Sequence, residues 1–129
     1  MAALRSTLIL FALTVMAQVG AASAQTVNSE KLVATVVIAK IPPGVPRAKI
    51  DEGIVAAVPT YQKIPGLIRK VFTVNDDTYG GVYLWADRAA AEAWFTPEFI
   101  AKVKARSGTE PQILYYDSPI QLDNRALPK

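Results

Sequence analysis

The chain has 129 residues, of which 51% are hydrophobic and 19% are charged, and its formal net charge is +3. This length suits one domain with a single core, and so high an apolar fraction excludes intrinsic disorder. The chain contains no His and no Cys. Their absence excludes a Ser–His or Cys–His nucleophile pair, a structural zinc site, a His-ligated haem, an iron–sulfur site and a disulfide. Acid–base chemistry must therefore come from Asp, Glu, Lys, Tyr or Arg, or from the substrate itself, and we expect no metal site.

The first 24 residues have the organisation of a secretory signal peptide. Arg5 precedes an apolar run, and the small residues Ala22-Ser23-Ala24 stand directly before Gln25. The apolar run is about 12 residues long, shorter than the roughly 20 that cross a bilayer. We expect cleavage before Gln25 and a mature chain of residues 25–129 in the periplasm or secreted, without membrane attachment. The alternative is an uncleaved N-terminal anchor.

The basic residues are scattered along the chain, apart from Lys102, Lys104 and Arg106. These three fall in the last turn of a predicted helix, where cations interact favourably with the negative end of the helix dipole. A solvated helix end explains this cluster better than a phosphate-binding patch does. We therefore expect no nucleic-acid partner.

Prolines and glycines divide the first half of the mature chain into predicted elements. Residues 31–39 are β-branched and apolar on both faces, which indicates a buried strand that ends at the prolines of residues 41–46. Residues 47–58 have apolar side chains at helical spacing, and we expect Pro59 to kink or end this helix. Residues 67–74 read as the second strand.

A hairpin and a broken helix follow. Residues 75–81 predict a turn, and residues 82–86 predict the third strand. Asp87 can cap a helix that runs through Trp94, while Thr96 and Pro97 start another that reaches Arg106. Residues 110–117 form the predicted fourth strand, and an extended tail follows. The order β-α-β-β-α-β predicts an α+β, ferredoxin-like domain over residues 25–129.

Alternation along the predicted strands leaves two apolar sheet faces. In the first strand Val33, Thr35, Val37 and Ala39 share one face, while Leu32, Ala34, Val36 and Ile38 share the other. Two helices cover only one face of such a sheet, and a large apolar patch is rarely exposed on a monomer. We therefore expect a homodimer in which the uncovered faces of two sheets pack together. The alternative is that the tail or a loop covers this face.

Two adjacent cations in the second strand are the first candidates for a site. Arg69 and Lys70 point to opposite faces because they are neighbours in a strand. Each needs a carboxylate, carbonyl groups or an anionic ligand, because an unpaired buried charge is costly. An ion pair at a subunit interface or sheet edge, and contact with a ligand, are both consistent with this pattern.

Aromatic residues provide candidate walls for a flat ligand. Tyr83 and Trp85 share a face of the third strand, and Tyr115 or Tyr116 can point into a cavity. The helical layer can supply the opposite wall through Tyr61, Trp94, Phe95 and Phe99. The alternative for each of them is packing in the core or at the dimer interface. No pair of carboxylates is placed for glycosidase chemistry, since Asp76-Asp77 lies in the predicted turn.

Four stretches together resemble the YdhR-like mono-oxygenases of the dimeric α/β-barrel, antibiotic-biosynthesis mono-oxygenase-like superfamily. They are residues 65–70 (PGLIRK), 80–85 (GGVYLW), 90–96 (AAEAWFT) and 116–119 (YDSP), the last together with Asp123 and Asn124. The resemblance implies a ferredoxin-like protomer, a sheet-to-sheet dimer and a pocket between helices and sheet. It also implies oxidation of a phenolic compound by O₂ without a cofactor, with electrons supplied by the substrate anion.

The resemblance also suggests roles for the candidate residues. Lys70 or Arg69 would stabilise the oxyanion or help to remove a proton, and Tyr61, Tyr83, Trp85, Trp94 or Tyr115 would hold the ring. We prefer Lys70, because a desolvated ammonium can exchange its proton and a guanidinium cannot. Arg69 replaces it if Lys70 and Tyr83 lie on opposite faces. The alternative function is a periplasmic binding or stress-associated protein without turnover.

Overall fold

The structure is a computed structural model that describes residues 31–124. The predicted signal peptide lies outside these residues. The elements are β1 (Val33–Lys40), α1 (Arg47–Tyr61), β2 (Leu67–Val74), β3 (Thr78–Trp85), α2 (Arg88–Trp94), α3 (Pro97–Ser107) and β4 (Gln112–Asp117). The four strands form one antiparallel sheet in the order β2-β3-β1-β4. The predicted α+β, ferredoxin-like fold is thus confirmed.

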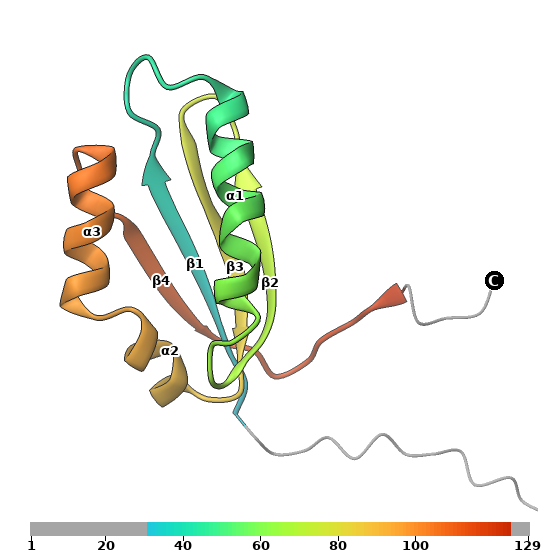
Figure 1. The fold of residues 1–129 in the computed structure, drawn as a ribbon. Coiled ribbons are helices and arrows are strands. Elements are labelled where there is room, and N and C mark those ends of the chain that lie inside the picture. Colours follow the sequence, from blue (N-terminus) through green and yellow to red (C-terminus); the bar gives the residue numbers. More distant parts are fainter. Residues whose placement is uncertain (1–30, 125–129) are drawn as a thin grey trace, which may run out of the picture.

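All the helices lie on one side of the sheet (Figure 1). Helix α1 lies next to β2 and β3, and α3 lies next to β1 and β4. None of the helices among residues 31–124 has the length and hydropathy of a membrane span. The helical side contains the core, in which Val33, Val37, Tyr83, Trp85 and Phe95 are buried together.

Helix α1 is longer than predicted, because it continues through Pro59 to Tyr61. Proline removes one backbone donor from the helix. Here the proline stands in the last turn, where the N–H of Gln62 still donates to the carbonyl of Val58 at 3.0 Å. Pro59 therefore does not end the helix, and the prediction that the helix ends there is wrong.

The hairpin turn is shorter than predicted. The side-chain Oδ1 of Asn75 accepts from the N–H of Asp77 at 2.9 Å and from the N–H of Thr78 at 2.7 Å. These bonds close the turn within four residues, so β3 begins at Thr78 and not at Val82. Gly80 and Gly81 consequently belong to the strand, not to the turn.

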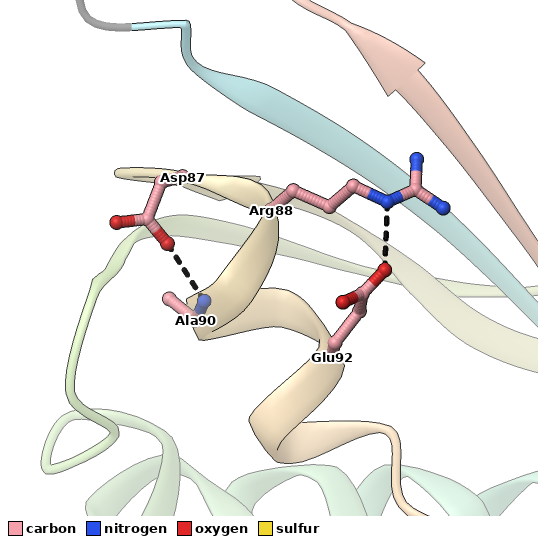
Figure 2. Close-up of polar contacts among 4 residues, drawn as sticks. All are labelled: Asp87, Arg88, Ala90 and Glu92. Carbon is pink, nitrogen blue, oxygen red and sulfur yellow. Dashed lines mark hydrogen bonds and ion pairs between the residues drawn. The ribbon is translucent and has the colours of Figure 1, made fainter.

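Helices α2 and α3 begin at the predicted residues. Asp87 Oδ1 accepts from the N–H of Ala90 at 2.7 Å, and Arg88 Nε donates to Glu92 at 2.7 Å one turn further on (Figure 2). Thr96 Oγ1 accepts from the N–H of Phe99 at 3.2 Å. These caps satisfy N–H groups that have no partner within the helix. They hold α2 and α3 as two short helices joined at Thr96.

The face of the sheet away from the helices remains apolar and uncovered. Ile38, Val71, Val82 and Tyr116 are 38–52% exposed on it. The tail does not cover this face with its own apolar side chains, since Ile120 and Leu122 are 83% and 78% exposed. The tail does reach this face through Asp123, which lies 3.7 Å from Arg69, but it leaves the four apolar side chains exposed.

Candidate functional site

A β-bulge decides which of the two adjacent cations faces the helices. Leu67 pairs with Trp85, and Arg69 pairs with Leu84, so Ile68 is an additional residue in β2. Without it, Arg69 would stand opposite Tyr83. With it, Lys70 stands opposite Tyr83, and side chains of opposed residues share a face. Lys70 therefore points to the helical side and Arg69 to the open face.

A cavity of about 280 Å³ lies between α1, α3 and the sheet. None of the α1 residues is buried. The lining of the cavity is mostly apolar. The residues are Val37, Ala39, Pro42, Val45, Lys49, Ile50, Gly53, Ile54, Ala57, Tyr61, Lys70, Phe72, Tyr79, Gly80, Tyr83, Phe99, Val103 and Arg106. We call this cavity the Lys70 pocket.

The ammonium of Lys70 lies against aromatic rings inside this pocket. Its Nζ is 3.1 Å from the ring centroid of Tyr61, 4.0 Å from that of Phe72 and 4.5 Å from that of Tyr83. Within residues 31–124, Lys70 forms no ion pair. Burial lowers the pKa of Lys70 from 10.5 to about 7, because removal from water disfavours the charged form. Near neutral pH this side chain can either accept or donate a proton.

Gly81 leaves room for the lysine side chain. A Cβ at this position would stand 3.0 Å from Lys70 Cε and 2.7 Å from the carbonyl oxygen of Val71. Any larger residue would push the lysine stem or the neighbouring strand aside. The absence of a side chain at Gly81 thus helps to fix where Nζ lies.

The hydroxyl of Tyr83 provides a hydrogen-bond donor in the pocket wall. Burial raises its pKa well above the usual value of 10.0, and the neighbouring Tyr61 hydroxyl raises it further. Tyr83 therefore stays protonated at any pH at which the protein functions. Its ring stacks on that of Trp85 at 5.7 Å and meets Phe95 edge-on at 5.2 Å, which fixes its orientation.

The charged residues among 31–124 that line the pocket are all cationic. They are Lys49, Lys70 and Arg106, and no carboxylate of this part of the chain lines it. Lys49 is neutralised in part by Glu52, 2.8 Å away, and its side chain is largely exposed. Lys70 is the cation that lies inside, among the rings. The pocket suits a flat ligand that carries a negative charge or can lose a proton.

The other predicted site residues do not line this pocket. Trp85 is fully buried in the core, where its Nε1 donates to Thr35 Oγ1 at 2.9 Å. Tyr115 lies beneath the guanidinium of Arg88, 4.7 Å from the ring centroid. Burial raises the pKa of Tyr115. Arg69 lies 3.7 Å from Asp123, and both side chains are about half exposed.

Trp94 stands behind the pocket wall. Its ring lies 5.7 Å from that of Tyr61 and 6.1 Å from that of Phe99, two residues that line the cavity. Its indole N–H is buried without a hydrogen-bond partner among the described residues. An unsatisfied buried donor is costly, so a ligand oxygen or a water that reached it would be bound there.

Several pocket residues were not predicted. Phe72 lies two positions after Lys70 in the same strand, so alternation alone could have placed the two on one face. Gly53 and Ala57 are small residues one turn apart on α1, and they face the cavity together. Nothing in the sequence pairs Tyr79 and Arg106 with this site. Within residues 31–124 no group of three or more acidic side chains could hold a metal ion.

No family model and no curated protein sequence matches the chain. Solved structures do resemble it. A protein of unknown function from Nitrosomonas europaea has a TM-score of 0.59 at 18% identity, over 78% of this chain and 97% of that one. SnoaB, a cofactor-independent oxygenase from Streptomyces nogalater, has a TM-score of 0.52 at 16% identity, over 71% and 97%.

The monooxygenase ActVA-Orf6 of Streptomyces coelicolor, solved with the ligand nanaomycin D, has a TM-score of 0.51 at 14% identity, over 81% and 99%. At such identities the likeness shows that the chain shares the fold of antibiotic-biosynthesis mono-oxygenase-like proteins. It does not distinguish the YdhR-like family among them, so that finer assignment stays a prediction.

Proposed function

We propose that this protein is a cofactor-independent mono-oxygenase that oxidises a small phenolic compound in the Lys70 pocket. The observation that carries the proposal is the amine of Lys70, which lies inside a pocket walled by aromatic rings and has no carboxylate partner within residues 31–124. The fold shared with oxygenases supports the same reaction class. That support comes from analogy of fold, and the pocket supplies the chemical argument.

The first step is the transfer of a proton from the phenol to Lys70. The amine is neutral above a pH of about 7, so it accepts the phenolic proton as the ligand binds. The resulting ammonium and phenolate form an ion pair in a pocket that excludes much of the water, where electrostatic stabilisation is strong. The phenolate is the electron-rich form that can react with O₂.

The reaction balances without a further reductant. For a phenol with hydrogen at the para carbon, one oxygen atom of O₂ becomes a carbonyl on that carbon, and the phenolic oxygen becomes the second carbonyl. The other oxygen atom leaves as water with the phenolic and the ring hydrogen. The ring supplies all four electrons. The protein binds the ring, holds the proton and stabilises the anion.

We further propose that two chains pack through their open sheet faces as a homodimer. The exposed side chains of Ile38, Val71, Val82 and Tyr116 form an apolar surface that a second copy can match about a twofold axis. Replacement of Val82 by Asp should give a monomer in sedimentation equilibrium. The matched control is Val55→Asp on the outer side of α1, where Val55 is 71% exposed. This variant should still sediment with twice the mass of one chain. A monomeric parent protein at micromolar concentration would rule out the homodimer.

We propose as well that the protein works after export, in the periplasm or outside the cell, because residues 1–24 have the pattern of a signal peptide. Intact-mass measurement on exported protein should give a chain that begins at Gln25. Retention of the whole N-terminus in the membrane fraction would indicate an anchor.

The enzymatic proposal is tested with 1-naphthol as probe. Oxygen uptake and formation of 1,4-naphthoquinone should occur with the parent protein. They should be lost in Lys70→Met and kept in Arg69→Met, which removes the neighbouring cation on the opposite face. Binding of unchanged 1-naphthol without oxygen uptake would instead indicate the alternative, a binding protein. If Lys70→Met oxidised 1-naphthol as fast as Arg69→Met does, Lys70 would not belong to the site.

A further inference from the structure

Two lysines line the same pocket in different surroundings. Lys49 Nζ lies 2.8 Å from Glu52, and its side chain is 66% exposed. Lys70 Nζ lies against the rings of Tyr61, Phe72 and Tyr83 and has no ion-pair partner within residues 31–124. Lys49 thus lies in solvent beside a carboxylate, while Lys70 lies among aromatic rings and borders the cavity.

We propose that Lys70 is a covalent binding site for aromatic aldehydes, which its amine captures as an imine. This activity is separate from the proposed oxygenation, because it needs neither O₂ nor a phenolic proton. Desolvated lysines in apolar pockets are the typical nucleophiles for carbonyl compounds. The neighbouring rings provide the surface on which an aromatic aldehyde stacks while its carbonyl carbon approaches Nζ.

The reaction needs only the amine and the aldehyde. The lone pair of Nζ adds to the carbonyl carbon, and the carbonyl oxygen takes up a proton to give a carbinolamine. Its hydroxyl then leaves as water while the C=N bond forms, so no electrons are exchanged with another reactant. The hydroxyl of Tyr83, kept protonated by burial, is a donor for the departing oxygen.

The groups around the pocket act on the charge of Lys70 in opposite directions. The titratable and charged residues that line it with Lys70 are Lys49 and Arg106, both cationic, and Tyr61, Tyr79 and Tyr83. No carboxylate among residues 31–124 lines the pocket, while the ring faces of Tyr61, Phe72 and Tyr83 toward Nζ favour the ammonium. Burial lowers the pKa of Lys70 to about 7. A large fraction of the amine is therefore nucleophilic at pH 7.5, in contrast to an ordinary lysine.

The test is reductive trapping with benzaldehyde and cyanoborohydride at pH 7.5 under argon, followed by peptide mapping. We expect one benzyl group per chain, formed on Lys70 at least about tenfold faster than on Lys49. Formaldehyde, which needs no aromatic wall, should discriminate far less between lysines. Lys70→Arg keeps the positive charge and cannot form an imine, so it should lose the fast modification while its circular dichroism stays like that of the parent.

Lys70→Met serves as a second variant and should behave like Lys70→Arg. Modification that spreads evenly over the lysines, or that favours Lys49, would overturn the proposal. So would a folded parent protein in which Lys70 stays unmodified. Because oxygen is excluded, a protein without oxygenase activity can still give the expected result, and the two proposals fail separately.

Discussion

The two halves of the helical layer cover the same sheet in different ways. On the side of α2 and α3, Ala91, Phe95 and Val103 are buried, and Phe95 meets Trp85 edge-on at 5.6 Å. On the side of α1, none of the 15 helix residues is buried, and six of them line the cavity of about 280 Å³, whose other wall includes Phe99, Val103 and Arg106 of α3. One half of the helical layer therefore supplies the packed core, while the other leaves space that a ligand can enter.

The difference arises from residue size on the facing surfaces. Helix α1 turns the small residues Gly53 and Ala57 toward the cavity, opposite Lys70. The α2–α3 side turns Phe95 inward, and its ring lies 5.2 Å from that of Tyr83 and 5.6 Å from that of Trp85. Aromatic side chains fill the space between a helix and a sheet, whereas Gly and Ala leave it empty.

The largest expected effect is on stability and separates the two halves. Phe95→Ala should lower the free energy of unfolding by about 3–5 kcal/mol, because it opens a cavity in a packed core. Ile54→Ala on the pocket wall should cost about 1 kcal/mol or less, since its side chain already borders empty space. Urea denaturation of both variants measures this. Equal losses would mean that the two halves are packed alike.

The next effect concerns the buried polar pair of the packed half. Thr35→Val keeps the shape of the side chain but leaves the indole N–H of Trp85 without its acceptor. The expected loss is about 2 kcal/mol, the cost of one buried donor left unsatisfied. Val37→Thr adds a hydroxyl on the same face and is the matched control for changing polarity there. An unchanged urea midpoint for Thr35→Val would show that the bond contributes nothing.

The buried amine of Lys70 should make the stability of the protein depend on pH. The pKa of Lys70 is about 7 in the folded protein and 10.5 as the ordinary value. Between these values the unfolded chain binds more protons, so the unfolding free energy rises with pH across this window. Below pH 7 the cost of burying the ammonium is fully present.

Lys70→Met removes this cost. We expect the variant to be more stable than the parent at pH 6, and this difference to be smaller by about 1–2 kcal/mol at pH 9. The change is less than the pKa difference alone would give, because the Lys70 side chain is partly hydrated. Arg69→Met is the control and should show no such change in slope. Parallel curves for the parent and Lys70→Met would contradict a buried amine.

The smallest expected effect comes from Gly53. A Cβ at this position meets nothing within 4 Å, so Gly53→Ala should stabilise the protein by about 0.5–1 kcal/mol through helix propensity. Gly53→Leu should extend into the cavity and prevent binding of 1-naphthol while the fold persists. Thermal unfolding and calorimetric titration measure the two effects. A Leu variant that still binds 1-naphthol as the parent does would place the ligand elsewhere.

Much of the fold could be predicted, because it depends on local patterns. The second strand has the bounds that its composition indicates, Leu67–Val74, and the caps at Asp87 and Thr96 follow from their side chains. The end of α1 and the start of β3 could not be predicted. They depend on backbone bonds around Pro59 and on three hydrogen bonds to one side chain, Asn75 Oδ1.

The candidate site could be predicted only in part. The sequence brings Lys70, Tyr61 and Tyr83 under consideration, and the pocket contains all three. Which of Arg69 and Lys70 faces them depends on a bulge at Ile68, and an apolar residue in a strand gives no local sign of a bulge. The partner of Trp85 lies 50 residues away in sequence. Such pairings arise from the register of the sheet, which no short motif specifies.

The most direct test of the account is an NMR titration of the Lys70 side chain, followed at its ¹³Cε resonance and assigned with Lys70→Arg. We predict that Lys70 titrates with a midpoint near pH 7 in the free protein, because burial lowers its pKa to about 7. We also predict that saturating 1-naphthol, kept under argon, moves the midpoint upward, because a bound phenolate stabilises the ammonium. A Lys70 resonance that titrates near the ordinary value of 10.5 and does not respond to 1-naphthol would contradict the account.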